Sequence, residues 1–182
     1  EEDFEDLKEK VRSHNADLGL GFDADGDRVI FIGKNGRFIP GEYSSALLAK
    51  YEDTETIVVT INVSQVAERI GKKVIRTKVG SPYVVSAMKE VGANFGFEAN
   101  GGGIFGEIMF SRDAGSTVIK MLNLMKQKDL NLGDLIDELP VFFLYKDKVD
   151  CPWEKDEEVL KEAKKEIKGI KTEELDGLKI WP

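Results

Sequence analysis

The chain of 182 residues has little cysteine and no long apolar run. Its single cysteine, Cys151, excludes a disulfide framework and is compatible with a reducing compartment. No apolar stretch approaches the roughly 18 residues that a helix needs to cross a bilayer, and the acidic N-terminal sequence EEDFEDLKEK is unlike a signal peptide. We therefore expect no membrane partner and a cytoplasmic location.

Net positive charge is also absent. Lysine and arginine number 26 against 34 aspartates and glutamates, so the formal net charge is −8. Proteins that bind nucleic acid by neutralising phosphates need clustered basic residues, and this sequence has no lysine or arginine run and no aromatic platform. The charge balance argues against a nucleic-acid partner and leaves a metal ion or a small anionic ligand open.

The centre of the chain alternates strand-like and helix-like segments, with strands expected at 56–61 and 73–77 and helices at 62–71 and 81–92. Ser81 is expected to cap the second helix, with Pro82 in its first turn. The alternation predicts βαβ units, and thus an α/β fold with three layers, α/β/α, around a mostly parallel mixed sheet. Ligand sites of such sheets lie on loops at the carboxyl ends of strands, where the segments after Phe22 and Phe97 are expected.

Two further segments, one before and one after this central part, do not follow the strand–helix alternation. The stretch RVIFIGKNGRFI, residues 28–39, predicts two short strands around a tight turn at Asn35 and Gly36. From about residue 145 onward the sequence is rich in lysine and glutamate, with one amphipathic helix and a final strand-like segment, GLKI. This change predicts that a separate α+β domain begins there.

Three aspartates stand at alternate positions in LGLGFDADGDRVIFIG, residues 18–33: Asp23, Asp25 and Asp27. Crowded carboxylates repel one another unless a cation neutralises them, and hard oxygen ligands on a tight loop suit Mg²⁺. The neighbouring Arg28 offers a bidentate grip on a phosphate that the metal also touches. The pattern therefore predicts a magnesium site that faces a phosphate.

Other interpretations of these aspartates compete with this one. A calcium loop of the EF-hand type is excluded, because its sixth position needs glycine and its twelfth needs glutamate, and these positions hold Arg28 and Lys34. A phosphatase with Asp23 as nucleophile also places two alternate aspartates after an apolar strand. The third carboxylate, Asp27, favours metal binding over covalent chemistry, and the phosphatase remains an alternative, as does a plain acidic turn.

Two motifs, in this order, resemble those of a known family. ADLGLGFDADGDR resembles the metal-binding loop of the α-D-phosphohexomutases, the phosphoglucomutase/phosphomannomutase superfamily, whose pattern is D-G-D-[GA]-D-R. FGFEANGG, residues 95–102, resembles the family's sugar-binding loop in the form associated with archaeal members. The stretches at 76–92 and 111–125 match as well, so the resemblance covers essentially the whole chain.

The resemblance implies a role for each matching residue. Asp23, Asp25 and Asp27 would hold Mg²⁺, and Arg28 would contact the phosphate at the catalytic centre. Sugar hydroxyls would bind Glu98 and Asn100, with Gly101 permitting close approach and Lys78 near the substrate. In the family a phosphoserine gives its phosphoryl group to a hexose monophosphate, which becomes a hexose bisphosphate. This intermediate turns around and returns its other phosphate to the serine. The implied substrates are glucosamine, mannose or glucose 1- or 6-phosphates.

The chain departs from the family pattern in two ways. Gly102 stands where the sugar-binding loop often has histidine, which leaves the sugar specificity open. Family members are four-domain proteins, and neither their serine loop nor their terminal phosphate loop is present here. We therefore expect the end of domain 2 at 1–39, domain 3 at 40–144 and the truncated start of domain 4 at 145–182. Such a fragment would catalyse the reaction only together with the missing domains. The alternative is a non-catalytic module that binds sugar phosphate or metal.

Overall fold

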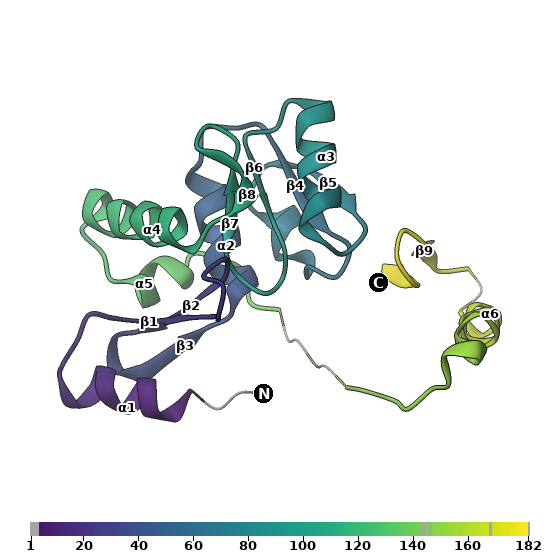
Figure 1. Cartoon of the computed structure of the whole chain (residues 1–182), viewed down its shortest axis with the longest axis horizontal. Helices are drawn as coiled ribbons and strands as arrows, with labels where there is room; N and C mark the ends of the chain where they lie inside the picture. Colours follow the sequence, from purple (N-terminus) through teal and green to yellow (C-terminus); the bar gives the residue numbers. More distant parts are fainter. Residues whose placement is uncertain (1–3, 143–144, 146, 168, 182) are drawn as a thin grey trace. The chain divides into compact units, whose positions relative to one another are not determined.

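The computed structural model describes residues 4–142, 145, 147–167 and 169–181. The chain divides into two compact units, residues 1–142 and 143–182 (Figure 1). The predicted boundary between residues 144 and 145 falls beside residues 143, 144 and 146, which lie outside the described residues, so the domain limits stay a prediction. Among the described helices, none combines the length and apolar character needed to cross a membrane.

The first unit begins with a helix and a small antiparallel sheet of order β1-β2-β3, formed by α1 (Glu5–Ser13), β1 (Leu18–Phe22), β2 (Val29–Gly33) and β3 (Arg37–Ile39). The turn between β2 and β3, with the 3-10 turn η1 (Lys34–Gly36), has φ +64° at Asn35 and +78° at Gly36. Asparagine and glycine tolerate this left-handed backbone, and the predicted hairpin is confirmed.

The loop after Phe22 was expected at the carboxyl edge of a parallel sheet, and this expectation is wrong. The loop joins β1 directly to β2, its antiparallel partner. Only residues 23–28 separate the two strands, whereas a parallel connection needs a crossover of a dozen residues or more. The aspartates therefore lie at the tip of a hairpin.

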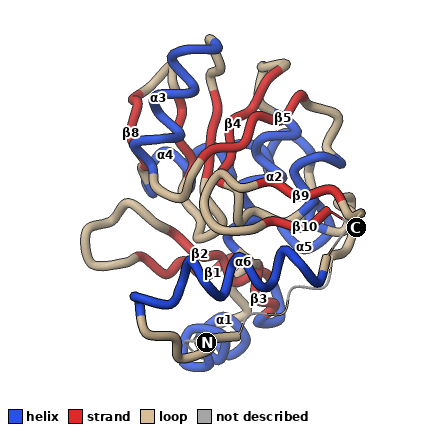
Figure 2. The backbone as a smooth tube through the Cα atoms, turned by 90° about the vertical axis from the view of Figure 1, so that its right-hand side faces the viewer, coloured by secondary structure: helices blue, strands red, loops and turns tan. Residues whose placement is uncertain are grey.

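The central sheet has five strands in the order β5-β4-β6-β7-β8. Figure 2 draws the strands in red and the helices in blue, with β4, β5 and β8 of this sheet labelled. Their bounds are β4 (Thr56–Thr60), β5 (Lys73–Thr77), β6 (Phe95–Phe97), β7 (Gly103–Phe105) and β8 (Met109–Arg112). β4 pairs in parallel with β5 and β6, whereas β7 is antiparallel to both β6 and β8. The sheet is mixed, as predicted, and its antiparallel half follows from the short connections around β7.

Helices cover both faces of this sheet: α3 (Ser81–Val91) on one, and α2 (Gly41–Tyr51) and α4 (Ala114–Lys128) on the other, while α5 (Leu132–Ile136) packs against α2 and β3. Successive strand residues point to opposite faces. Val58 accordingly packs with Val84 and Met88 of α3, while its neighbours Ile57 and Val59 belong to the larger core cluster beneath α2. The predicted three-layer α/β/α arrangement is confirmed.

Two local predictions need correction. The N-cap of α3 is Gly80, with φ +126°, and Ser81 is the first helical residue and forms no capping hydrogen bond. The predicted helix at 62–71 is only the 3-10 turn η2 (Gln65–Arg69). The backbone just before η2 does not form a helix, because the guanidinium of Arg76 donates hydrogen bonds to the carbonyl oxygens of Thr60, Val63 and Ser64.

The second unit contains the 3-10 turn η3 (Trp153–Lys155), the helix α6 (Asp156–Glu166) and two antiparallel strands, β9 (Lys171–Glu173) and β10 (Lys179–Trp181). The helix and the final strand lie where the sequence predicts them. Val159 and Leu160, on the apolar side of α6, remain exposed.

Candidate functional site

The three aspartates gather at the tip of the β1-β2 hairpin, in a segment named here the aspartate loop (residues 23–28). Asp23, Asp25 and Asp27 each offer a carboxylate oxygen, and these oxygens lie within 4.8 Å of one another. Gly26, with φ +71°, turns the loop and donates its N–H to the carbonyl of Asp23 at 3.3 Å. A cluster made only of carboxylate oxygens has the ligand chemistry that Mg²⁺ prefers.

Arg28 ends the aspartate loop and binds its first carboxylate from two sides. Its backbone N–H donates to Asp23 Oδ1 at 3.1 Å, and its Nε donates to Oδ2. Its two terminal nitrogens form no hydrogen bond with any residue that the structure describes, and 45% of its side chain is exposed. The fork of the guanidinium is thus available to an external anion, as the predicted phosphate contact requires.

The charge state of Asp23 follows from this contact. Partial burial raises the pKa of its carboxyl group, but the backbone and side-chain hydrogen bonds from Arg28 outweigh burial and hold the pKa well below its ordinary value. The pKa of Arg28 is raised mainly by the same side-chain hydrogen bond. Asp23 is therefore ionised at neutral pH, as a ligand for a cation must be.

A second segment, the glutamate loop (residues 98–102), joins β6 to β7 and packs directly against the aspartate loop. Gly101 and Gly102 have φ +88° and +80°. A Cβ atom on Gly101 would lie 2.5 Å from the carbonyl oxygen of Val29, and one on Gly102 would collide with that of Asp27. Glycine is needed here because the two backbones touch. The predicted role of Gly101 in sugar approach remains a prediction.

Glu98 begins the glutamate loop and is 5% exposed. Its Oε1 accepts a hydrogen bond from the backbone N–H of Gly80 at 3.0 Å, which ties it to the start of α3. Asn100, two residues further along the same loop, is exposed. Both predicted sugar-binding side chains therefore stand on one short loop beside the aspartates.

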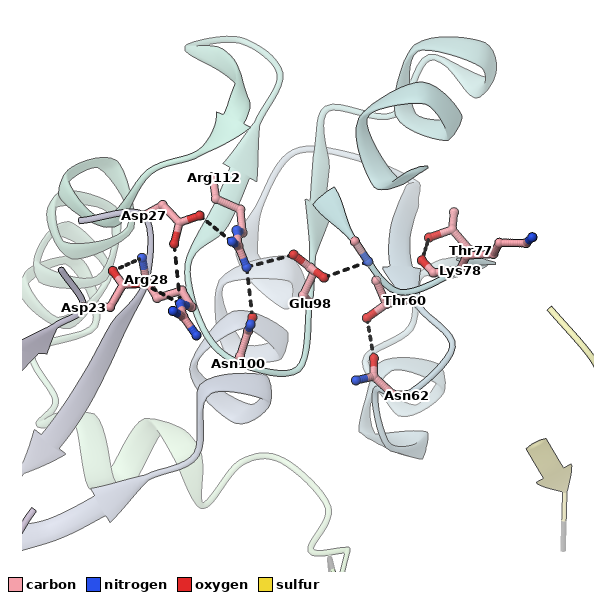
Figure 3. A network of polar contacts seen from close by, with 11 residues as sticks. Asp23, Asp27, Arg28, Thr60, Asn62, Thr77, Lys78, Glu98, Asn100 and Arg112 are labelled. Atoms are coloured by element: carbon pink, nitrogen blue, oxygen red, sulfur yellow. Dashed lines mark hydrogen bonds and ion pairs between the residues drawn. The ribbon is translucent and has the colours of Figure 1, made fainter. Parts of the chain in front are cut away.

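Arg112, at the end of β8, connects the two loops, and it is a site residue that was not predicted from the sequence (Figure 3). One terminal nitrogen, Nη1, lies 2.8 Å from Glu98 Oε2 and donates to Asn100 Oδ1 at 3.3 Å, while Nη2 bonds Asp27 Oδ2. The side chain is only 15% exposed. Its sequence signal is an arginine that ends a strand directly before the helix cap Asp113.

Lys78 is not brought into this cluster. It follows β5 at the carboxyl edge of the parallel strands, where β4 ends at Thr60, whose hydroxyl donates a hydrogen bond to Asn62 just beyond the strand. Lys78 is exposed, and Figure 3 shows its side chain pointing away from Arg112. Its predicted contact with substrate remains a prediction.

Known proteins resemble this chain in sequence and in fold. The family model described as "Phosphoglucomutase/phosphomannomutase, alpha/beta/alpha domain III" matches residues 40–142. A phosphoglucomutase/phosphomannomutase from Thermococcus kodakarensis is 37% identical over an alignment 189 positions long, which covers 99% of this chain and 41% of the relative. The chain belongs to the phosphoglucomutase/phosphomannomutase family. It spans about two fifths of the length of this relative.

Solved structures of phosphoglucomutase/phosphomannomutase proteins share the fold. A family protein from Burkholderia thailandensis superposes with a TM-score of 0.75 at 22% identity, over 98% of this chain and 40% of that one. An N-acetylphosphoglucosamine mutase from Aspergillus fumigatus, in complex with GlcNAc-6P and magnesium, gives 0.53 at 14% identity, over 66% and 35% of the two chains. At these identities the two structures show the fold of this chain, and the magnesium is that of the Aspergillus protein.

One carboxylate oxygen of the aspartate loop, Asp27 Oδ1, indicates that this chain suits magnesium. Asp27 Oδ1 is buried and has no hydrogen-bond partner among the described residues, although Arg28 Nε lies 3.5 Å away. A buried carboxylate oxygen without a hydrogen bond is costly unless a cation binds it. The carboxylates of Asp23, Asp25 and Asp27 together fit a Mg²⁺ ligand set.

Proposed function

We propose that the polypeptide carrying these 182 residues is a phosphohexomutase, which transfers a phosphoryl group within a hexose phosphate. The observation that carries the proposal is the contact of the aspartate and glutamate loops through Arg112 in a chain of this family. One loop offers cation and phosphate ligands, and the other offers groups for hydroxyls. The proposed substrates are glucosamine, mannose or glucose 1- and 6-phosphates.

The aspartate loop would bind the phosphate end of the reaction. Asp23, Asp25 and Asp27 would hold Mg²⁺, which when bound offsets the negative charge that builds up during phosphoryl transfer. The terminal nitrogens of Arg28 would bind two phosphate oxygens, because a guanidinium fork matches phosphate geometry. Its Nε bond to Asp23 supports this assignment, since it holds the side chain in place while the fork stays open.

The glutamate loop would bind the sugar. The side-chain oxygens of Glu98 lie between Arg112 and the N–H of Gly80, and carboxylate oxygens accept hydrogen bonds from hydroxyl groups. Asn100 uses its oxygen on Arg112, which leaves its amide NH₂ to donate to a sugar oxygen. Lys78 would reach the substrate from the neighbouring strand end, and Gly101 would let the sugar approach the backbone closely.

The phosphoryl group would come from a phosphoserine outside these 182 residues. Consistent with the 41% coverage of the Thermococcus relative, we assign residues 1–39 to the end of domain 2, 40–144 to domain 3 and 145–182 to the start of domain 4. The remaining domains of the same polypeptide are then the required partners.

The test compares the complete polypeptide with the 182-residue chain. Each is incubated with Mg²⁺ and glucosamine 6-phosphate, mannose 6-phosphate or glucose 1-phosphate, and the products are followed by ³¹P NMR. We expect the complete polypeptide to interconvert the 1- and 6-phosphates of at least one sugar, and the chain alone to produce none.

Two outcomes would overturn the proposal. Release of inorganic phosphate by the chain alone, abolished by Asp23→Asn, would identify a phosphatase with an aspartyl nucleophile. Binding of hexose phosphate by the complete polypeptide without any turnover would identify a non-catalytic binding module.

A further inference from the structure

Arg112 contacts three residues of the candidate site although it belongs to neither loop. It stands at the end of β8, immediately before the cap of α4, where Asp113 accepts a hydrogen bond from the N–H of Ser116 at 2.6 Å. The first helical residue, Ala114, donates its N–H to the carbonyl of Gly26 in the aspartate loop at 3.3 Å. The base of the Arg112 side chain is therefore fixed by a strand, a capped helix and the aspartate loop itself.

The guanidinium of Arg112 uses its two terminal nitrogens on different loops. Nη2 bonds Asp27 in the aspartate loop, and Nη1 bonds Glu98 and Asn100 in the glutamate loop. Because a guanidinium group is planar and rigid, the two carboxylates cannot shift independently while both bonds persist. A lysine at this position has one ammonium group and lacks this fork.

The hydrogen bond between Arg112 and Asp27 also determines which oxygen of Asp27 is available to a metal ion. Arg112 occupies Oδ2, and Oδ1 is buried without a hydrogen bond to any described residue. Partners of this kind, one bond behind a metal ligand, orient the ligand and commonly change metal affinity about 10- to 100-fold when they are removed. Arg112 thus leaves Oδ1, which lies 3.5 Å from Arg28 Nε in the aspartate loop, as the Asp27 oxygen available to a cation.

We propose that Arg112 is a positioning residue that orients Asp27 for the divalent cation and Glu98 and Asn100 for the sugar, so that both ligands are held in one fixed relation. This inference rests on the proposed function for its sugar half. Its metal half rests on the carboxylate cluster alone.

The experiment uses the complete polypeptide as wild type and as Arg112→Met, Arg112→Lys and Arg37→Met variants. Arg37 is the matched control, because it pairs with Asp137 and bonds the carbonyl of Gly133 rather than either loop. Equilibrium binding of Mn²⁺ is measured by electron paramagnetic resonance of the free ion. KM and kcat are measured for the hexose phosphate that the wild type turns over best, and the melting temperature reports folding.

For both Arg112 variants we expect the Mn²⁺ dissociation constant and the KM for hexose phosphate to rise about tenfold or more. Arg112→Lys keeps the positive charge. If neither the dissociation constant nor the KM of this variant returns to the wild-type value, the guanidinium fork is the required feature. Arg37→Met is expected to lower the melting temperature and to leave both constants unchanged.

The positioning role is overturned if the folded Arg112 variants bind Mn²⁺ and hexose phosphate like the wild type, or if only their melting temperatures fall. If only the Mn²⁺ dissociation constant or only the KM for hexose phosphate rises, Arg112 does not link the cation site to the sugar site. A wild type without mutase activity, in which Arg112→Met still weakens Mn²⁺ binding, refutes the proposed function and leaves the orientation of Asp27 supported.

Discussion

At the scale of single residues, the site is a balance of charges. Four carboxylates, those of Asp23, Asp25, Asp27 and Glu98, meet two guanidinium groups, those of Arg28 and Arg112, which leaves a formal charge of −2. Each arginine neutralises part of the repulsion, and Arg28 in addition holds the pKa of Asp23 below its ordinary value. The remaining charge matches a divalent cation, which is the physical reason to expect one at this place.

Asp25 is the exposed member of the cluster, so its replacement should change metal binding with little effect on packing. Asp25→Asn removes a charged ligand, and we expect the Mg²⁺ dissociation constant of the complete polypeptide to rise about tenfold or more, measured by calorimetric titration. Asp17→Asn is the control, because Asp17 is also acidic and its side chain is 80% exposed outside the cluster. An unchanged magnesium affinity in Asp25→Asn would contradict the metal site.

At the scale of elements, the position of α3 on the sheet depends on a glycine. Gly96 lies in the middle of β6, and a Cβ atom there would lie 2.6 Å from Met88 Sδ and 2.7 Å from Val84 Cγ1. The helix therefore packs closely over this strand, and its first residues stay within reach of Glu98 through Gly80. The packing of one helix thus helps to place a side chain of the site.

Gly96→Ala should consequently destabilise the protein. Added atoms in a well-packed core force neighbours to shift, and we expect a loss of about 1–3 kcal/mol in the free energy of unfolding, measured by urea denaturation of the 182-residue chain. Gly115→Ala makes the same chemical change in α4, where an added Cβ would have only ordinary contacts with Asp113. This control should be neutral or stabilising by up to about 1 kcal/mol, and equal losses in both variants would refute the packing argument.

At the scale of the whole molecule, the described core lies in the first unit. The members of both core clusters end at or before Phe142, and the last elements to join are α5 and the residue Leu139 after it. The second unit has its own small sheet, while α6 has no buried residue. The first unit thus contains both a hydrophobic core and the residues of the candidate site.

A truncated chain of residues 1–142 should therefore fold by itself. We expect its thermal unfolding, followed by circular dichroism, to be cooperative and to occur at the melting temperature of the main transition of the 182-residue chain. A chain of residues 1–131 is the control, because it loses four buried core residues: Leu132, Leu135, Ile136 and Leu139. That shorter chain should lose cooperative unfolding, and the same loss in residues 1–142 would show that the core needs the second unit.

Much of the local structure could be predicted because its cause is local. The turn at Asn35 and Gly36 needs residues that tolerate positive φ, and Gly92 ends α3 with φ +68° for the same reason. The cap at Asp113 has a local cause too, since its side chain accepts a hydrogen bond from the backbone N–H of Ser116, three residues later. The start of α3 could not be predicted, because Gly80 is held by Glu98, which is 18 residues away along the chain.

By itself, the sequence determined the alternation of strands and helices, the family resemblance and the cluster of three aspartates, because spacing along the chain carries all three. Only the tertiary structure decided that these aspartates lie on an antiparallel hairpin and that Arg112 joins them to Glu98. Residues 27 and 112 are 85 positions apart, and only the folded sheet brings them together. Periodicity records which face a residue occupies, whereas the meeting of two loops depends on strand order and on the glycines that let their backbones touch.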